Sequence, residues 1–232
     1  MNLLQHCPFG LATLLVVLPM GVSLPAEDPV ASLHSVISVK ASNPILHGLE
    51  VKTPLDADRR WVSLRGPQFY SSPEKPNENE LPSYLNWYEI RKPKPEAGKN
   101  LKLTDEFSGR QSFDVVLGGP AFYLMPAQTI KDGPPSDTPE GLNHFIAFRI
   151  ENVDSVTLPE PTPGKPAFVC VPAEEWHHAD HFPIKAASTL LMVYEAASKR
   201  LDAKVTTIDQ FGLNGLTTEA KRFVYVRATR KE

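Results

Sequence analysis

The amino-acid sequence predicts an all-β fold of four degenerate β repeats in two pseudo-symmetric halves, sandwich- or barrel-like. Proline supplies 23 of the 232 residues, roughly twice its usual share, and its missing backbone N–H disfavours long helices. Short apolar segments rich in β-branched and aromatic residues are bounded by Pro, Gly and Asn, as is typical of strands. One such segment recurs four times along the chain, which indicates internal duplication.

The recurring segment centres on a phenylalanine. In three of the four copies a proline stands two residues before the phenylalanine and another stands four residues after it. The copies are Gly66–Pro73, Gly119–Pro126, Lys165–Pro172 and Ala220–Arg227. Phe69 and Phe168 are 99 residues apart, and Phe122 and Phe223 are 101 apart, which indicates a duplicated half. Because proline cannot donate to a β-ladder, the closing prolines are expected to end strand pairing.

A shorter strand-like segment precedes each copy. These segments are Leu46–Val51, Leu85–Ile90, Phe145–Ile150 and Leu190–Ala196. Their spacing predicts units that alternate short, long, short, long, and the two long units share a motif, Asp105-Glu106-Phe107 and Asp209-Gln210-Phe211. Since a lone hairpin cannot bury its apolar face, we expect the halves to pair as one domain.

Residues 1–26 read as a secretory signal peptide. The run Leu11–Leu18 is continuously apolar, and no charged residue occurs before Glu27. Cleavage is expected after Ala26 or Ser23. The run is too short for a membrane span, which needs about 20 apolar residues, so the mature protein is expected to be secreted or periplasmic, without a membrane span.

The rest of the chain divides simply. Residues 27–44 carry no repeat and are expected to form an ordered edge or a loose arm, and 45–232 form a single β-repeat domain with halves of about 45–135 and 141–232. Loops are expected at 77–82 and at 131–140, the second of which is rich in Pro and Asp. The one candidate helix is Ala173–His181, whose early glutamates suit a helix N-terminus; a single turn fits equally well.

The strongest candidate for chemistry is a histidine cluster. It consists of His177, His178, Asp180 and His181, and it resembles part of the H-x-H-x-D-H zinc motif of metallo-hydrolases. Catalytic zinc needs three protein ligands, but Trp176 occupies the position of the first histidine and no histidine follows His181. Two interpretations stay open, a metal-dependent hydrolase using this loop and a solvated polar connection. The second is preferred, and neither a metal nor a cofactor is predicted.

Other chemistry-bearing residues have structural interpretations. Cys7 lies in the leader, so Cys170 is the single mature thiol and is expected in the core. Asp105 and Asp209 fit turns that position the following phenylalanine, with an acid–base pair as the alternative. Aromatic residues predict either core packing or a carbohydrate-stacking surface; they are Trp61, Tyr70, Trp87, Tyr88, Phe122 and Tyr123.

Charge and composition limit the function classes. Lys and Arg number 24 against 27 Asp and Glu, a net charge of −3, which argues against a nucleic-acid partner. No phosphate-binding loop, nucleophile elbow or CxxC motif occurs. The sequence therefore predicts a non-enzymatic binding or structural module of the periplasm or cell exterior. The alternatives are the hydrolase above and a carbohydrate or cell-envelope binder; the partner itself is not predicted.

Three ordered motifs resemble an exported bacterial repeat family of unknown function. The family's units run approximately His-Phe-x-Cys-Tyr-Lys-Val, Asp-Gln-Phe and Leu-Cys-Val-Pro-Ala. The matching segments here are Asn143–Ile150, Asp209–Gly212 and Phe168–Ala173. The resemblance covers roughly 84–229, with 46–75 as a degenerate further copy, and it implies compartment and architecture but no reaction or ligand.

Overall fold

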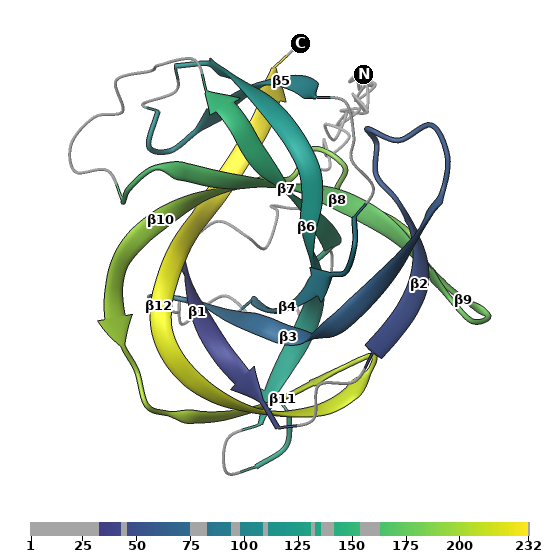
Figure 1. Ribbon diagram of the computed structural model, residues 1–232, viewed down its shortest axis with the longest axis vertical. Coiled ribbons are helices and arrows are strands. Elements are labelled where there is room, and N and C mark those ends of the chain that lie inside the picture. The colour runs from purple at the N-terminus through teal and green to yellow at the C-terminus, as the bar shows by residue number, and fades with distance from the viewer. Residues whose placement is uncertain are drawn as a thin grey trace, which may run out of the picture.

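The described residues form strands and connections arranged as a ring (Figure 1). The computed structural model describes residues 33–42, 46–74, 83–93, 98–108, 111–130, 133–135, 142–153 and 163–231. Within them, eight strands close a ring in which each pairs antiparallel with the next along the chain and the last pairs with the first. They are β1 (His34–Ala41), β3 (Arg60–Pro73), β4 (Tyr84–Ile90), β6 (Phe113–Ile130), β7 (His144–Val153), β8 (Pro166–His177), β10 (Leu190–Arg200) and β12 (Gly212–Lys231).

Four further strands lie outside this ring. They are β2 (Leu46–Lys52), β5 (Lys99–Asp105), β9 (Asp180–Phe182) and β11 (Lys204–Asp209). β2, β5 and β11 each pair with the first part of a long strand, β3, β6 and β12 respectively. Their other edges pair with β8, β12 and β6, so each of these three strands joins two ring strands that are not neighbours. β9 pairs with β8 alone.

The ring strands form four antiparallel pairs, β1–β3, β4–β6, β7–β8 and β10–β12, which we call the ring hairpins. The four ring hairpins share one register. In each, the recurring phenylalanine stands opposite a residue of the preceding strand: Phe69 opposite Ser38, Phe122 opposite Glu89, Phe168 opposite Arg149 and Phe223 opposite Glu195. The all-β prediction is confirmed, and all four recurring segments lie in ring strands.

The four phenylalanines form a closed aromatic tetrad inside the ring. Phe69 contacts Phe122 at 5.3 Å between ring centroids, Phe122 contacts Phe168 at 5.5 Å, Phe168 contacts Phe223 at 5.5 Å, and Phe223 contacts Phe69 at 5.6 Å. All four pairs are edge-to-face, the geometry that aromatic quadrupoles favour. The tetrad therefore brings β3, β6, β8 and β12 into contact inside the ring.

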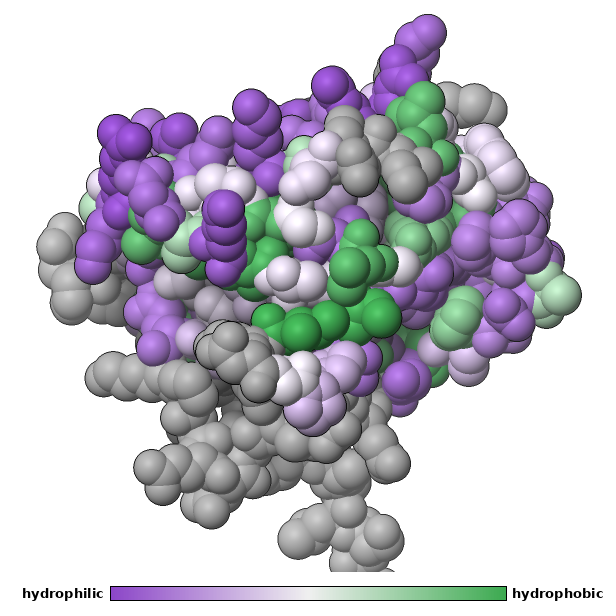
Figure 2. Space-filling view, turned by 90° about the horizontal axis from the view of Figure 1, so that it is seen from below, coloured by the Kyte–Doolittle hydropathy of each residue, from purple (hydrophilic) through white to green (hydrophobic). Residues whose placement is uncertain are grey.

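Apolar residues pack on both faces of the ring strands. The inner face carries Trp87 and Cys170 beside the tetrad, whereas Tyr88, Phe148 and Tyr194 point to a second core under the outer strands. Because successive strand residues point to opposite faces, burial on both sides explains why the first residues of β7 and β10 are almost continuously apolar. The face seen in Figure 2 is mostly hydrophilic around a compact hydrophobic area.

Of the closing prolines, Pro73 ends β3 as expected, whereas the other two do not end their strands. Pro67, Pro120 and Pro166 lie where the register shifts just before the phenylalanine, and Pro126 and Pro172 lie within β6 and β8. A residue without an N–H fits a site where the ladder is already interrupted by a bulge. The recurring Pro-x-Phe thus marks the irregularity that precedes each tetrad residue in these three strands.

The first hairpin differs from the prediction. Leu46–Val51 precedes the Phe69 segment as the other short segments precede theirs, but it lies in β2 outside the ring and pairs with Arg60–Arg65. The ring partner is β1, from the segment 27–44 that was expected to be an edge or an arm; it pairs with β12 on one side and β3 on the other. The alternating pattern of 46–51 is that of any half-buried strand, so it did not identify which strand of the unit it was.

The candidate helix Ala173–His181 does not form. β8 continues to His177 and turns through His178 and Ala179 into β9. Glu174 and Glu175 therefore lie on opposite faces, and Glu175 is fully buried, so the two glutamates mark strand alternation rather than a helix N-terminus.

Some expectations concern residues outside those that the structure describes. They are the leader 1–26, the loop 77–82 and all of 131–140 except 133–135. Among the described residues, no helix is long and apolar enough to cross a membrane.

Candidate functional site

A rigid loop leads from β2 into β3 and is anchored on Asp56. The Asp56 carboxylate accepts hydrogen bonds from Thr53 N and Oγ1 at 2.9 and 2.7 Å and pairs with Lys99 Nζ at 3.0 Å and with Arg60. Burial alone would raise the pKa of Asp56, but these hydrogen bonds and the Arg60 charge hold it below its ordinary value. The start of β3 is therefore fixed.

Trp61, the second residue of β3, is 69% exposed. Its indole lies against Gly48 of the neighbouring strand β2, where a Cβ atom would overlap the ring. Burying part of one face of an aromatic ring against backbone limits its rotamers while leaving the remainder accessible. Trp61 is thus an exposed aromatic side chain held in place.

A groove opens beside Trp61. It has a volume of about 710 Å³ and is lined by residues 56–63, by 90–93 at the end of β4, and by Pro120. An adjoining part of about 270 Å³ shares 90–93 and Pro120 and continues to Phe122 of the tetrad and to Arg149. We call the two parts together the Trp61 groove. Its size is in the range of ligand-binding clefts.

The second polar site surrounds Asp209, at the turn between β11 and β12. Its carboxylate accepts hydrogen bonds from Tyr88 Oη at 2.6 Å, Asn86 Nδ2 at 2.7 Å, Asn214 Nδ2 at 3.2 Å and the Phe211 backbone N–H at 2.9 Å. Burial raises the pKa of Asp209. Four donors on one carboxylate leave it little capacity to act on a ligand.

Glu175 continues this cluster from β8. Its carboxylate accepts hydrogen bonds from Tyr123 Oη and Gln210 Nε2 and lies 3.7 Å from His144 Nδ1. Burial raises the pKa of Glu175 and lowers the pKa of His144 to about 3. No residue of this cluster lines the Trp61 groove.

The recurring Asp-x-Phe motif forms matching contacts in both halves. Tyr194 Oη donates to Asp105, as Tyr88 does to Asp209, and Phe107 packs edge-on against Tyr194 at 5.2 Å. Each aspartate therefore binds a tyrosine of the other half, and the two aspartates do not form an acid–base pair with each other. Sequence reasoning missed the tyrosines, although both occupy the same position in their strands.

The histidine cluster lies on the β8–β9 hairpin, where the His177 and His178 rings lie 4.3 Å apart and His181 turns to another partner. His178 is at the turn with a φ of 55°. His181 stacks on Trp176 at 4.7 Å between ring centroids, whereas His177 packs edge-on against Phe211 at 5.3 Å; Asp180 pairs with His177 in the hairpin register. Within the described ranges, no three His, Cys, Asp or Glu side chains are grouped so that they could hold a metal ion.

The other sequence candidates separate by burial. Cys170 is fully buried, and burial raises the pKa of its thiol. Trp87 is also fully buried and donates to Ser71 Oγ at 3.2 Å. Tyr70, Tyr88 and Tyr123 are buried as well, and Phe122 is half-buried at the end of the groove. Trp61 is the member of the aromatic set that faces solvent.

One comparison with known proteins gives a match. A family model described as a repeat of unknown function (DUF7450) matches residues 84–227, from β4 to near the end of β12. No curated protein and no solved structure matches the chain.

Proposed function

We propose that the chain, which belongs to the DUF7450 family of repeats of unknown function, is an exported, non-enzymatic binding module that takes a carbohydrate in the Trp61 groove. The observation that carries this proposal is an indole that is 69% exposed yet held against Gly48. It stands at a groove of about 710 Å³. A fixed aromatic face binds the apolar face of a sugar ring with little loss of side-chain entropy.

Two features support the absence of catalysis in this proposal. The carboxyl groups with raised pKa values, Asp209 and Glu175, have hydrogen-bond donors from the protein itself. Neither lines the groove, and a general acid or base must reach its substrate. The periplasm or cell exterior as its location rests on the apolar run Leu11–Leu18, which ends in small residues.

Binding to a glycan array tests the proposal, followed by titration calorimetry of the glycans that bind. Trp61→Ala is expected to lower the affinity at least about fivefold, because loss of one stacked aromatic residue removes roughly 1–3 kcal/mol. Leu213→Ala is the matched control, since Leu213 is 68% exposed and lies outside the groove. Binding that survives Trp61→Ala unchanged, or no glycan binding at all, contradicts the proposal.

A further inference from the structure

We infer that the ligand of the Trp61 groove is an anionic glycan, a sugar chain that carries carboxylate or sulfate groups. This inference rests on the proposed function and adds the chemical class of the ligand. The groove is lined by six cations and three carboxylates: Arg59, Arg60, Arg65, Arg91, Lys92 and Arg149, against Asp56, Asp58 and Glu89. The whole chain has the opposite balance, with a net charge of −3.

Some of these charges are satisfied within the protein. Asp56 is neutralised by Arg60 and Lys99. Arg59 lies 3.8 Å over the Trp176 ring and 3.7 Å from Glu50. None of these residues needs a ligand to balance its charge.

Besides Arg65, which stands opposite Glu89 in the β3–β4 register, three exposed cations remain along the groove. Arg91, Lys92 and Arg149 form no ion pair with any residue in the described ranges. Asp58 and Glu89 are the groove carboxylates that likewise have no ion pair within those ranges, and Arg65 is opposite Glu89, so the cations stay in excess. Arg149 also lies 5.9 Å from the centroid of the Phe168 ring. Unpaired like charges on one surface repel, and an anion bound between them removes that repulsion. The net positive charge of this surface therefore favours an anionic ligand.

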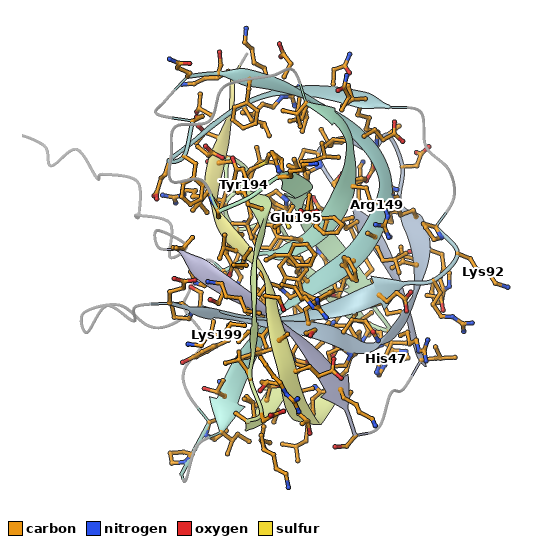
Figure 3. The ribbon with its side chains drawn as sticks, turned by 60° about the vertical axis from the view of Figure 1, so that its left-hand side comes forward. His47, Lys92, Arg149, Tyr194, Glu195 and Lys199 are labelled. Atoms are coloured by element: carbon orange, nitrogen blue, oxygen red, sulfur yellow. The ribbon has the colours of Figure 1, made fainter. Side chains whose placement is uncertain are left out.

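The backbone places these cations beside Trp61. The Arg91 N–H donates to Ser63 O at 2.8 Å, which fixes the end of β4 to the strand that carries Trp61. Lys92 has a φ of 46°, a left-handed conformation that costs a non-glycine residue energy. Figure 3 shows Lys92 extending away from the ring on the same side as Arg149, with Lys199 toward the other side.

The ligand must combine a stacking face with anionic groups. Trp61 supplies the stacking surface at one part of the groove, and Arg149 lines the adjoining part. Arginine binds carboxylate and sulfate with two parallel hydrogen bonds. Two adjoining parts suit a chain of sugar rings better than a single ring.

Single-stranded nucleic acid is the competing anionic polymer. It is bound by a row of stacking aromatics along a positive channel, whereas this groove offers one exposed indole. The chain also has a pI of about 6.2, well below that of typical nucleic-acid-binding domains. The observations therefore favour the glycan.

Calorimetry with four probes tests the inference: an oligogalacturonate, its uncharged methyl ester, a heparin oligosaccharide and single-stranded DNA of matched charge. We expect at least one acidic glycan to bind, with affinity that falls as salt rises. Arg91→Ala and Lys92→Ala should each weaken it roughly five- to tenfold. Lys199→Ala is the matched control and should leave it unchanged. Unchanged melting temperatures show that the variants remain folded.

The outcomes separate the two proposals. If the methyl ester binds as well as the acid and needs Trp61, the inference fails while the proposed function stands. If single-stranded DNA binds more tightly than both acidic glycans, or if Lys92→Ala and Arg91→Ala leave acidic binding unchanged, the inference also fails. If none of the sugars binds and the glycan array is empty, both fail.

Discussion

Replacing Phe168 by leucine tests whether the aromatic tetrad holds the ring together. Phe168 is 6% exposed and makes edge-to-face contacts at 5.5 Å with both Phe122 and Phe223. Leucine keeps most of the buried apolar area but loses both contacts, and each aromatic pair contributes about 0.5–1.5 kcal/mol beyond its area. We therefore expect Phe168→Leu to lower the unfolding free energy by about 1–3 kcal/mol more than the same substitution at a buried site without aromatic neighbours.

Phe113 provides that reference site. It is 3% exposed in the outer core, and no ring contact links it to another aromatic residue of the described ranges. Guanidinium-induced unfolding gives both free energies, provided that the m values of the variants agree. A double-mutant cycle on Phe122 and Phe168 should return a coupling of about 0.5–1.5 kcal/mol. Equal losses for Phe168→Leu and Phe113→Leu, with no coupling, would refute the role of the tetrad.

Three further predictions concern buried polar groups. Burial lowers the pKa of His144 to about 3, so the unfolded chain takes up the proton first and stability falls as the pH drops from about 6.5 toward 3. His144 alone contributes a loss of about 3 kcal/mol between pH 8 and pH 4, measured as the difference between the wild type and a His144→Gln variant in denaturant unfolding; a variant with the same pH profile as the wild type contradicts it. Tyr88→Phe removes a donor from the buried Asp209 carboxylate and should lower the unfolding free energy by about 1–3 kcal/mol; an unchanged melting curve would count against the contact. The Cys170 thiol is fully buried with a raised pKa, so a thiol reagent should label it only as fast as the protein unfolds; prompt labelling of the native protein is the contrary result.

The recurring segments were predictable because a strand buried on both faces leaves a strong sequence signal. Phe168-Val-Cys-Val has apolar residues at every position, since the inner and outer cores both bury it. β1 carried no such signal, because His34 and Ser35 begin a strand whose place is set by pairing with β12 and β3. The composition of a short segment does not show which distant strands it will pair with.

The candidate site was less predictable, because its residues meet only in the folded chain. Trp61 and Trp87 are both tryptophans in strand-like segments, and nothing local shows that the first is exposed and the second buried. That difference arises because Gly48 supports Trp61 from a neighbouring strand, whereas Trp87 faces the ring interior. The tyrosine partner of Asp209 is likewise 121 residues away. In the histidine cluster, proximity along the chain did not show the grouping either: the His177 and His178 rings lie 4.3 Å apart, whereas His181 stacks on Trp176.

The most direct test of the Trp61 groove is a nuclear magnetic resonance titration of the tryptophan indoles. The chain has three tryptophans, and each gives one indole N–H signal: Trp61 in the groove, Trp176 beneath Arg59 and Trp87 inside the ring. On addition of the acidic oligosaccharide that binds in calorimetry, the Trp61 signal should shift most and the Trp87 signal should stay fixed. A saturating titration that moves the Trp87 or Trp176 signal and leaves Trp61 in place would contradict the account.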